Sequence, residues 1–246
     1  MLRQARHGGE RLAAGGLIAV YPEELYSFLL EVAKARDLAV DAATGLGWAA
    51  LPLAYHFDRV CAVDKEPRVL RKAVVRERLH YLAAAAESLP LPSNCVDLLT
   101  VAQALHQLDL DRFYTEAKRV LRPRGVIACW CFGKHRLAQH LDRPYRGIYR
   151  TLESYWPPER HLVVEGYASL AFPFERIASP EITMSVRWRQ EDFHKYLRSW
   201  TAFRRYVGEG NRDLLDEMQR HSWGASEARY PISWPIHLLI GRKPRW

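Results

Sequence analysis

A short apolar segment that ends in an acidic residue and a glycine-containing turn constrains this chain most. Residues 38–47 read Leu-Ala-Val-Asp-Ala-Ala-Thr-Gly-Leu-Gly. Gly45 and Gly47 let the backbone approach a ligand closely where a strand turns into a helix. A second apolar segment, residues 60–64, ends in Asp64. Asp64 lies near the offset of roughly 20 residues at which a carboxylate meets a ribose diol. The pattern therefore predicts a nucleoside-binding crevice.

The glycine turn differs from the turns that hold phosphate groups. Ala50 stands where a Gly-x-Gly-x-x-Gly sequence would have its third glycine. The chain also lacks the Gly-x-x-x-x-Gly-Lys-Ser/Thr sequence of the phosphate-binding loop. We therefore expect this turn to be a poor cradle for phosphate groups.

Apolar segments alternate with amphipathic ones over the first half of the chain. We expect strands at 38–42, 60–63, 80–83, 96–102 and 126–131, and helices beginning at Pro22 and spanning 48–55, 66–77 and 111–121. Strands that are apolar throughout and separated by helices favour a mostly parallel sheet covered on both faces. The expected fold class is therefore α/β.

The pattern changes after residue 133. Residues 134–172 are rich in aromatic residues and arginines without clean periodicity, and regular patterns return at 174–187, 191–206, 212–219 and 236–240. We expect a mobile segment over 1–20 and a single domain over 21–246. Within that domain, 21–133 would be the cofactor-binding half, and 134–246 a substrate-binding or lid insertion with the final strands.

Charge and cysteine content narrow the class of protein. The chain has 246 residues, a net charge of +8 and four cysteines. The basic residues form no continuous run, so a solvated basic face is expected rather than a nucleic-acid interface. The cysteines do not suggest a disulfide framework, and no cysteine pairs have zinc spacing. Without a long apolar run or a signal peptide, we expect a cytoplasmic protein that binds neither membrane nor metal.

Several further motifs appear in the same order as in a known family. They are Ala86-Glu-Ser-Leu-Pro90, Val96-Asp97, Ala104-Leu-His106 and Glu116-Ala-Lys-Arg-Val-Leu-Arg-Pro-Arg-Gly125. Together with the glycine turn and Asp64, they resemble the class I S-adenosylmethionine-dependent methyltransferases over about residues 20–133. The small-molecule branch that includes trans-aconitate methyltransferase-like proteins is the most similar. The resemblance implies a Rossmann-like fold with a seven-stranded, mostly parallel sheet.

The resemblance also implies roles for individual residues. The amino-acid end of S-adenosylmethionine would lie against Asp41 and the backbone of the turn. Asp64 would bind the ribose hydroxyls, and Lys65 would flank the adenine. The other implied contacts are the backbone of Ala86 and nearby Glu87 with adenine, and Gln103 with the methionine moiety. The implied cofactor-binding set is Asp41, Ala42, Ala43, Thr44, Gly45, Gly47, Asp64, Lys65, Ala86, Glu87 and Gln103.

Four residues depart from the family pattern. Thr44 stands where a cysteine is common, and Arg124 replaces the more usual glycine in the turn before the fifth strand, where only a local effect is expected. The other two bear on the cofactor. Ala43 stands where a glycine is usual and adds a methyl group where backbone and cofactor come closest. Ala85 stands where an aspartate often reaches the adenine amino group. Both changes remove or crowd an expected cofactor contact.

Candidate substrate-binding residues come from the aromatic and basic part of the chain. They are Tyr21, Trp156, Arg160, Tyr196 and Trp200. Tyr196 and Trp200, four residues apart, also fit the buried stripe of a helix. Arg160 has the geometry to bind a substrate carboxylate in a bidentate manner. His106 is the candidate catalytic base, with packing at a helix start as the alternative.

The expected activity is transfer of a methyl group from S-adenosylmethionine to a small molecule, with S-adenosylhomocysteine as the product. An oxygen acceptor, either carboxylate or hydroxyl, is favoured over nitrogen or carbon. Three alternatives remain open: an RNA methyltransferase, a catalytically degenerate binder of S-adenosylmethionine, and a non-methylating enzyme that uses this cofactor.

Overall fold

The computed structural model describes residues 12–13, 16–17, 21–216, 218, 223–224 and 227–244. The chain divides into two compact units, each described by itself below. The sheet unit comprises Tyr21–Lys134, Glu159–Thr183 and Trp234–Trp246, and the helical unit comprises Met1–Val20, His135–Pro158 and Met184–Ser233. The sequence had indicated a single domain over 21–246. Most of the segment expected to be mobile, 1–20, lies outside the described residues, although β1 (Leu12–Ala13) pairs with β2 (Gly16–Leu17).

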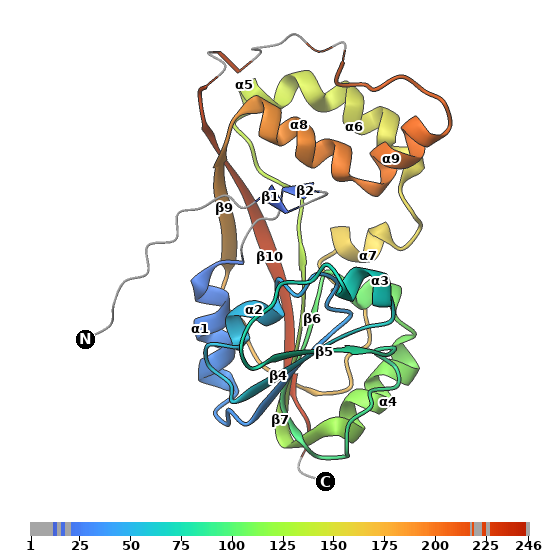
Figure 1. Ribbon diagram of the computed structural model, residues 1–246. Coiled ribbons are helices and arrows are strands. Elements are labelled where there is room, and N and C mark those ends of the chain that lie inside the picture. Colours follow the sequence, from blue (N-terminus) through green and yellow to red (C-terminus); the bar gives the residue numbers. More distant parts are fainter. Residues whose placement is uncertain are drawn as a thin grey trace, which may run out of the picture. The chain divides into compact units, whose positions relative to one another are not determined.

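The strands pair into one eight-stranded sheet (Figure 1). Its order is β5-β4-β3-β6-β7-β10-β8, and β9 also pairs with β10. The strands are β3 (Leu38–Ala42), β4 (Arg59–Asp64), β5 (Leu79–Ala83), β6 (Val96–Ala102), β7 (Leu121–Phe132), β8 (Glu175–Arg176), β9 (Ile182–Trp188) and β10 (Tyr230–Arg242). The pairs among β3 to β7 are parallel, whereas β10 is antiparallel to β7 and β8. The predicted mostly parallel sheet is confirmed.

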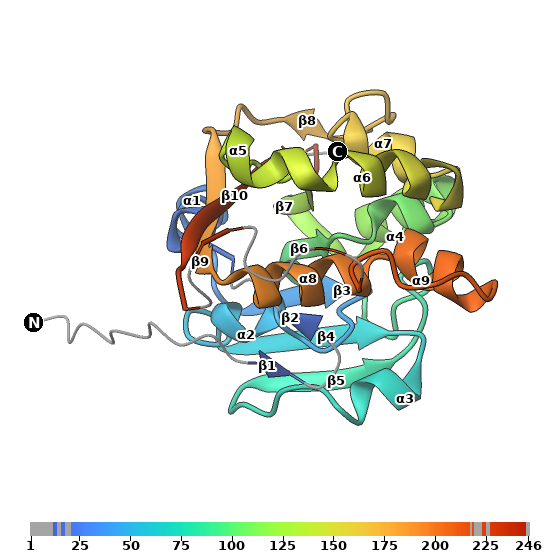
Figure 2. The same ribbon diagram turned by 90° about the horizontal axis from the view of Figure 1, so that it is seen from above.

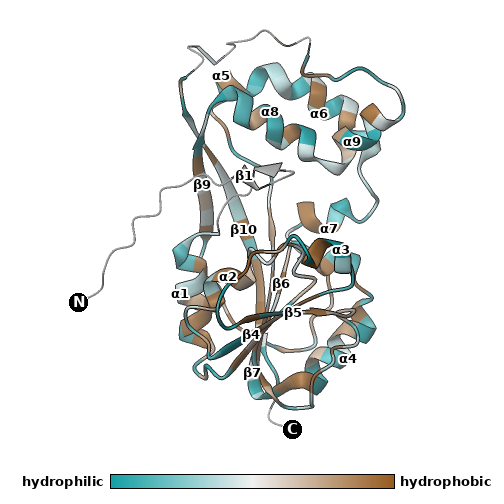
Figure 3. Cartoon of the chain, in the orientation of Figure 1, coloured by the Kyte–Doolittle hydropathy of each residue, from teal (hydrophilic) through white to brown (hydrophobic). Residues whose placement is uncertain are grey.

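Helices cover both faces of the parallel strands. All five residues of β3 are buried, as expected for a strand covered on two sides. The helices α1 (Glu23–Val32) and α4 (Leu110–Val120) lie on opposite sides of the sheet (Figure 2). Figure 3 shows apolar residues along the central strands and polar residues on the outer turns of α4. The inner stripe of α4 packs into the main apolar cluster through Phe113, Tyr114, Ala117 and Val120.

Two helices beside the glycine turn are shorter than the sequence indicates. The helix expected at 48–55 is α2 (Ala50–Leu53), and the helix expected at 66–77 is α3 (Pro67–Leu70). After α3 the backbone leaves the helical path, because the Val74 amide donates 3.1 Å to the Leu46 carbonyl. The chain therefore folds back onto the glycine turn where the sequence predicts two more helical turns.

The helix predicted over 212–219 is wrong over its described part. Residues 211–213 have no regular structure and 214–216 form a turn. The Asp213 carboxylate accepts from the Leu215 amide at 2.8 Å and from Arg198 Nε at 2.6 Å. Aspartate that bonds the backbone two residues on favours a turn over a helix.

The helical unit is held together by aromatic packing. Its helices are α5 (Gln139–Asp142), α6 (Arg146–Leu152), α8 (Gln190–Ser199) and α9 (Thr201–Gly208), with 3₁₀ turns at Arg143–Tyr145 and Glu153–Tyr155. Phe193 packs edge-on against Tyr145 at 5.0 Å and lies 5.3 Å from Trp223, measured between ring centroids. The sheet unit has two further short elements, α7 (Arg160–Val164) and a 3₁₀ turn at Leu105–Gln107. Among the described residues, no helix is long and apolar enough to cross a membrane.

Candidate active site

The carboxyl ends of the parallel strands define the candidate site. β3 is the first parallel strand, and the chain places β4 on one side of it and β6 on the other. The strand order therefore reverses at β3. In open α/β sheets, ligands bind outside the carboxyl ends of the strands at such a reversal. The turn 43–47, Lys65, Glu87 and Gln103 all follow β3 to β6 at this edge.

The turn after β3 requires glycine at one position and tolerates strain at another. Gly47 has φ +83°, and a Cβ there would lie 2.0 Å from the Tyr81 hydroxyl oxygen. Gly45 has φ +56°, and a Cβ there would meet open space. Ala43 has φ 54°, a conformation that costs a residue with a Cβ about 1 kcal/mol or more. The turn thus keeps an open approach to the backbone of Gly45.

Asp64 joins the end of β4 to the glycine turn. Its Oδ2 accepts from the Gly45 amide at 2.9 Å, and its Oδ1 accepts from the Glu66 amide at 2.9 Å. An ionised carboxylate has about four acceptor positions, so each oxygen keeps capacity for one further donor. Asp64 can therefore hold the turn and still accept from two ligand hydroxyls.

Asp41 is fully buried beneath the turn. Its Oδ1 accepts from the Thr100 hydroxyl at 2.6 Å and its Oδ2 from the Thr44 hydroxyl at 2.5 Å. Burial raises the pKa of Asp41 to about 6, although the two hydroxyl donors act in the opposite direction. The carboxyl group links β3, β6 and the turn.

The raised pKa of Asp41 predicts a pH-dependent stability. The folded state binds the Asp41 proton more tightly than the unfolded state, so this stabilisation is full below about pH 4 and is lost as pH rises through about 6. Relative to Asp41→Asn, the wild type should lose on the order of 2 kcal/mol of unfolding free energy between pH 4 and pH 7. Urea unfolding at both pH values measures this difference. The exposed control Asp58→Asn should show the same dependence of unfolding free energy on pH as the wild type. If the unfolding free energy of Asp41→Asn depends on pH as strongly as that of the wild type, the burial argument is contradicted.

The residues implied to surround adenine occupy the loops after β4 and β5. Lys65 is exposed, and Ala86 is buried. Glu87 is partly buried, and its Oε1 accepts from the Asp109 amide at 3.1 Å, at the start of α4. The backbone carbonyl of Asp64 accepts from the Ala84 amide at 3.1 Å, which fixes the two loops relative to each other. The proposed contacts of these residues with adenine stay predictions.

Gln103 lies directly after β6 with an unused donor. Its backbone has φ 62°, and its Oε1 accepts from the Phe132 amide at 3.2 Å. Its Nε2 is buried and has no hydrogen bond of normal geometry within the described chain, and the same holds for Trp130 Nε1. The Tyr21 hydroxyl lies beside both side chains, and the Tyr21 ring packs edge-on against Trp130 at 5.4 Å. Burial raises the pKa of Tyr21, so the phenol stays neutral.

His106 lies in the 3₁₀ turn after β6, half-buried beside Tyr167. Its Nδ1 is 3.2 Å from the Tyr167 hydroxyl oxygen, and its Nε2 is 3.4 Å from Gln107 Nε2. Burial lowers the pKa of His106 below 6.5, and the positive charge of Arg160 lowers it further. α7, which begins at Arg160, packs against the 3₁₀ turn that contains His106.

Comparison with known proteins identifies the fold and the family. Residues 40–129 match the model of a methyltransferase domain family. A Dictyostelium discoideum protein named as a methyltransferase is 30% identical, over 91% of this chain and 89% of its own length. The chain belongs to the class I S-adenosylmethionine-dependent methyltransferases.

Solved structures agree with this assignment. A protein of Anaeromyxobacter dehalogenans described as a type II methyltransferase is 38% identical, with a TM-score of 0.84 over 93% of this chain and 99% of the other. A protein of Bacillus halodurans described as a methyltransferase is 18% identical, with a TM-score of 0.51 over 90% and 99%. The second similarity concerns the fold alone. The resemblance drawn from the sequence motifs is confirmed.

The residues of this methyltransferase fit S-adenosylmethionine at the carboxyl edge. Asp64 keeps free acceptor positions for a ribose diol, and the backbone of Gly45 faces open space. The buried Nε2 of Gln103, beside the Tyr21 hydroxyl and without a hydrogen bond of normal geometry among the described residues, is the kind of donor that a carboxylate of the methionine moiety would satisfy. These three features lie on the loops that follow β4, β3 and β6.

The five candidate substrate residues of this methyltransferase fall into two groups. Tyr21 and Arg160 belong to the sheet unit, and Trp156, Tyr196 and Trp200 belong to the helical unit. Trp200 lies 5.3 Å from Trp156 and 5.5 Å from Tyr196, measured between ring centroids. These three rings therefore form one aromatic cluster, each of them partly exposed.

Three residues that the sequence did not single out contact the glycine turn, His106 and the aromatic cluster. Tyr81 packs against Gly47, and its hydroxyl donates to the Val74 carbonyl at 2.7 Å. Tyr167 contacts His106 and has a φ of 63°, and the glycine before it, Gly166, is the turn residue that the sequence shows. Buried His135 lies within 6.0 Å of Tyr196 and 5.9 Å of Trp200, measured between ring centroids. No periodicity marks Tyr81 or His135 in the sequence.

Proposed function

We propose that this methyltransferase moves a methyl group from S-adenosylmethionine to an oxygen of a small acidic molecule, either a carboxylate or a hydroxyl. The observation that carries the proposal is the placement of His106 and Arg160. The His106 turn follows β6 at the edge that holds the glycine turn, and the charge of Arg160 acts on the imidazole. A guanidinium beside a neutral imidazole suits an acceptor that carries a carboxylate and loses a proton.

The reaction demands little from the protein beyond alignment. S-adenosylmethionine supplies a methyl group already activated on a sulfonium. The chain has to place the acceptor oxygen nearly in line with the carbon–sulfur bond and exclude water, and such positioning contributes about 7–11 kcal/mol in favourable intramolecular cases. In this proposal, Arg160 holds the acceptor carboxylate. His106 accepts the proton of a hydroxyl acceptor, whereas a carboxylate acceptor needs no base.

The contacts of His106 are compatible with a base. A proton on Nδ1 would be donated to the Tyr167 oxygen at 3.2 Å, and Nε2 would then keep the lone pair that accepts a proton. The lowered pKa keeps the imidazole neutral near pH 7. Because the side chain is only half-buried, an acceptor that displaces the Gln107 amide, 3.4 Å away, can reach Nε2.

Binding and product formation test the proposal together. Calorimetric titration should show saturable binding of S-adenosylmethionine and S-adenosylhomocysteine. Mass spectrometry of a panel of small carboxylic acids and phenols should then show a gain of one methyl group. Cofactor binding without a methylated product across the panel supports a non-methylating protein instead. RNA binding that weakens steeply with salt, with methylated RNA as product, supports the nucleic-acid alternative.

Replacing His106 tests the base. With a hydroxyl acceptor, His106→Ala should lower turnover by about 100-fold while leaving the affinity for S-adenosylhomocysteine unchanged. The wild-type rate should fall as pH drops below the lowered pKa of His106, because only the neutral imidazole accepts a proton. Unchanged turnover in His106→Ala refutes the role, and a control at an exposed histidine, His56→Ala, should keep the wild-type rate.

A further inference from the structure

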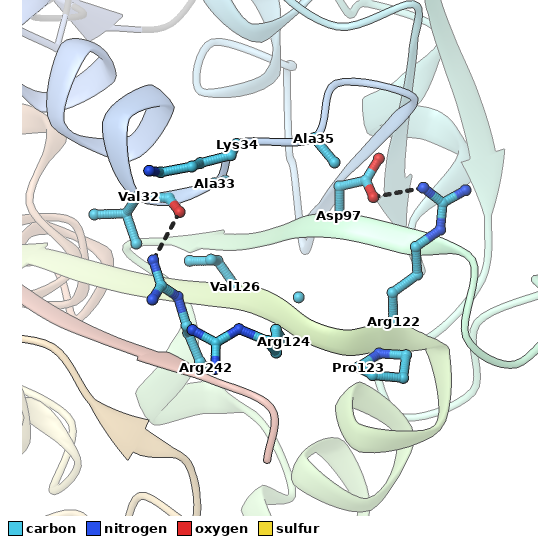
Figure 4. Close-up of a pocket in the computed structure, with 11 residues that line it drawn as sticks. Val32, Ala33, Lys34, Ala35, Asp97, Arg122, Pro123, Arg124, Val126 and Arg242 are labelled. Atoms are coloured by element: carbon cyan, nitrogen blue, oxygen red, sulfur yellow. Dashed lines mark hydrogen bonds and ion pairs between the residues drawn. The ribbon is translucent and has the colours of Figure 1, made fainter. Parts of the chain in front are cut away.

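A second pocket lies at the other edge of the sheet unit. It has a volume of about 440 Å³, within the usual range for small-molecule sites, and is lined by residues that precede the parallel strands (Figure 4). Lys34 and Ala35 precede β3, Asp97 stands at the start of β6, and residues 122–126 form the first part of β7. The pocket is thus separate from the glycine turn, which follows the carboxyl end of β3.

Four cationic side chains line this pocket with a single carboxylate. Lys34, Arg122, Arg124 and Arg242 line it, and Asp97 is the only acidic lining residue. Asp97 is already engaged, because its Oδ1 accepts from Arg122 Nη1 at 2.7 Å. Its Oδ2 accepts from the Asp37 and Leu38 amides, both at 2.9 Å. Arg122 is paired with Asp37 as well, also at 2.7 Å, and within the described residues neither carboxylate forms an ion pair with the other three cations.

The remaining three cations have no acidic partner among the described residues. Arg242 Nη2 donates to the carbonyl of Val32, the last residue of α1, at 3.0 Å, so its charge faces the C-terminal end of a helix and not a carboxylate. The side chains of Lys34 and Arg124 make no ion pair in the described part of the chain, and Figure 4 shows both on the rim of the pocket with Arg242. Like charges that gather around one cavity repel each other, and an anion in the cavity would remove that repulsion.

The backbone of Arg124 adds an independent observation. It has φ 66°, a left-handed conformation that is strained for a residue with a Cβ. Its amide donates to the Lys243 carbonyl at 3.2 Å, and the Lys243 amide donates to the Gly125 carbonyl at 2.9 Å, so the residue directly after β10 holds the turn in this shape. Such strain concentrates where a side chain has a functional task. Here the turn places Arg124 beside Arg242, because Arg242 is the strand partner of Val126, two residues after Arg124.

We propose that this pocket binds a small organic polyanion that carries at least two carboxylate or phosphate groups. Arg124, Arg242 and Lys34 would bind the anionic groups, since guanidinium groups match the oxygens of both in a bidentate manner. The apolar side chains of Val32, Ala33, Ala35, Pro123 and Val126 line the same cavity and suit the carbon skeleton of the ligand. This polyanion is a ligand distinct from the methyl acceptor, and its binding does not depend on which acceptor the active site methylates.

Calorimetric titration with pyrophosphate and with citrate, in 150 mM NaCl, tests this pocket. We expect saturable binding of at least one probe with a Kd below about 1 mM. Binding of pyrophosphate alone assigns a phosphate ligand, binding of citrate alone assigns a carboxylate ligand, and binding of both supports the shared chemistry. The double variant Lys34→Gln/Arg124→Gln should weaken that binding at least tenfold. S-adenosylhomocysteine should bind the double variant as it binds the wild type.

Two variants distinguish specific binding in this pocket from a general effect of positive surface charge. Arg112→Gln removes an exposed cation outside the pocket and should leave probe binding unchanged. Arg124→Gly relieves the positive φ and should weaken probe binding while the midpoint of thermal unfolding stays the same or rises. The proposal fails if neither probe binds below about 1 mM, or if the double variant binds as the wild type does. It also fails if Arg112→Gln weakens binding as much as Arg124→Gly.

Discussion

Replacing Phe113 with alanine should lower the free energy of unfolding by about 3–5 kcal/mol. The side chain is fully buried on the inner face of α4, in the apolar cluster that also contains Val40, Leu99 and Ile127 of three neighbouring strands. Removal of the ring loses its transfer free energy and leaves a cavity that the surrounding strands cannot fill. Urea unfolding, followed by circular dichroism, gives the midpoint and slope from which the loss is calculated.

A control on the same helix separates packing from helix propensity. Arg112 is exposed on α4, one residue before Phe113, and Arg112→Ala should change stability by less than about 0.5 kcal/mol. Comparable losses in both variants would mean that α4 is stabilised by local effects and not by the cluster. A small loss in Phe113→Ala alone would place the cooperative core of the protein elsewhere.

The sheet could be predicted because its physical signals are local. Residues 38–42 and 96–102 are apolar strands with buried surroundings, and each matches its expected bounds in the structure. The helix expected at 111–121 is found as α4, one residue earlier. Periodicity and burial point to the same answer in these segments, so tertiary contacts did not alter them.

Predictions failed where a distant partner decides the conformation. α3 ends at Leu70 because the following chain returns to the glycine turn through the amide of Val74. The segment after 211 forms a turn because Asp213 bonds Arg198 of α8 and its own backbone. Neither partner is visible in a window of about ten residues, so helical periodicity alone extends both helices too far.

The contacts within the candidate site were likewise predicted only in part. The sequence indicated that residues 41–47 and Asp64 meet at one sheet edge, and the bond from the Gly45 amide to Asp64 shows that they do. The sequence did not indicate that Thr100 of β6 donates to Asp41, because this contact depends on strand order. It likewise did not show that the Tyr81 side chain packs against Gly47, because the position of β5 brings the two residues together.

Replacing Asp64 with alanine should weaken the binding of S-adenosylmethionine by roughly 30- to 1,000-fold, or about 2–4 kcal/mol. In the proposed complex, the two oxygens of this carboxylate accept from the two ribose hydroxyls, and bonds to a charged group contribute about 1.5–3 kcal/mol each. The substitution also releases the Gly45 amide, which Asp64 Oδ2 holds at 2.9 Å, so the turn loses a fixed position beside the ligand. Calorimetric titration with S-adenosylhomocysteine measures the loss without interference from turnover.

Two further variants separate ligand contact from support of the turn. Asp64→Asn keeps one side-chain oxygen and should weaken binding by less than Asp64→Ala, because one acceptor remains. Glu66→Ala removes a neighbouring exposed carboxylate and should bind as the wild type does, which excludes a general effect of negative charge at this edge. If Asp64→Ala binds S-adenosylhomocysteine within threefold of the wild type while remaining folded, the cofactor does not contact the end of β4. The adenosyl group would then have to be placed against other loops of the carboxyl edge.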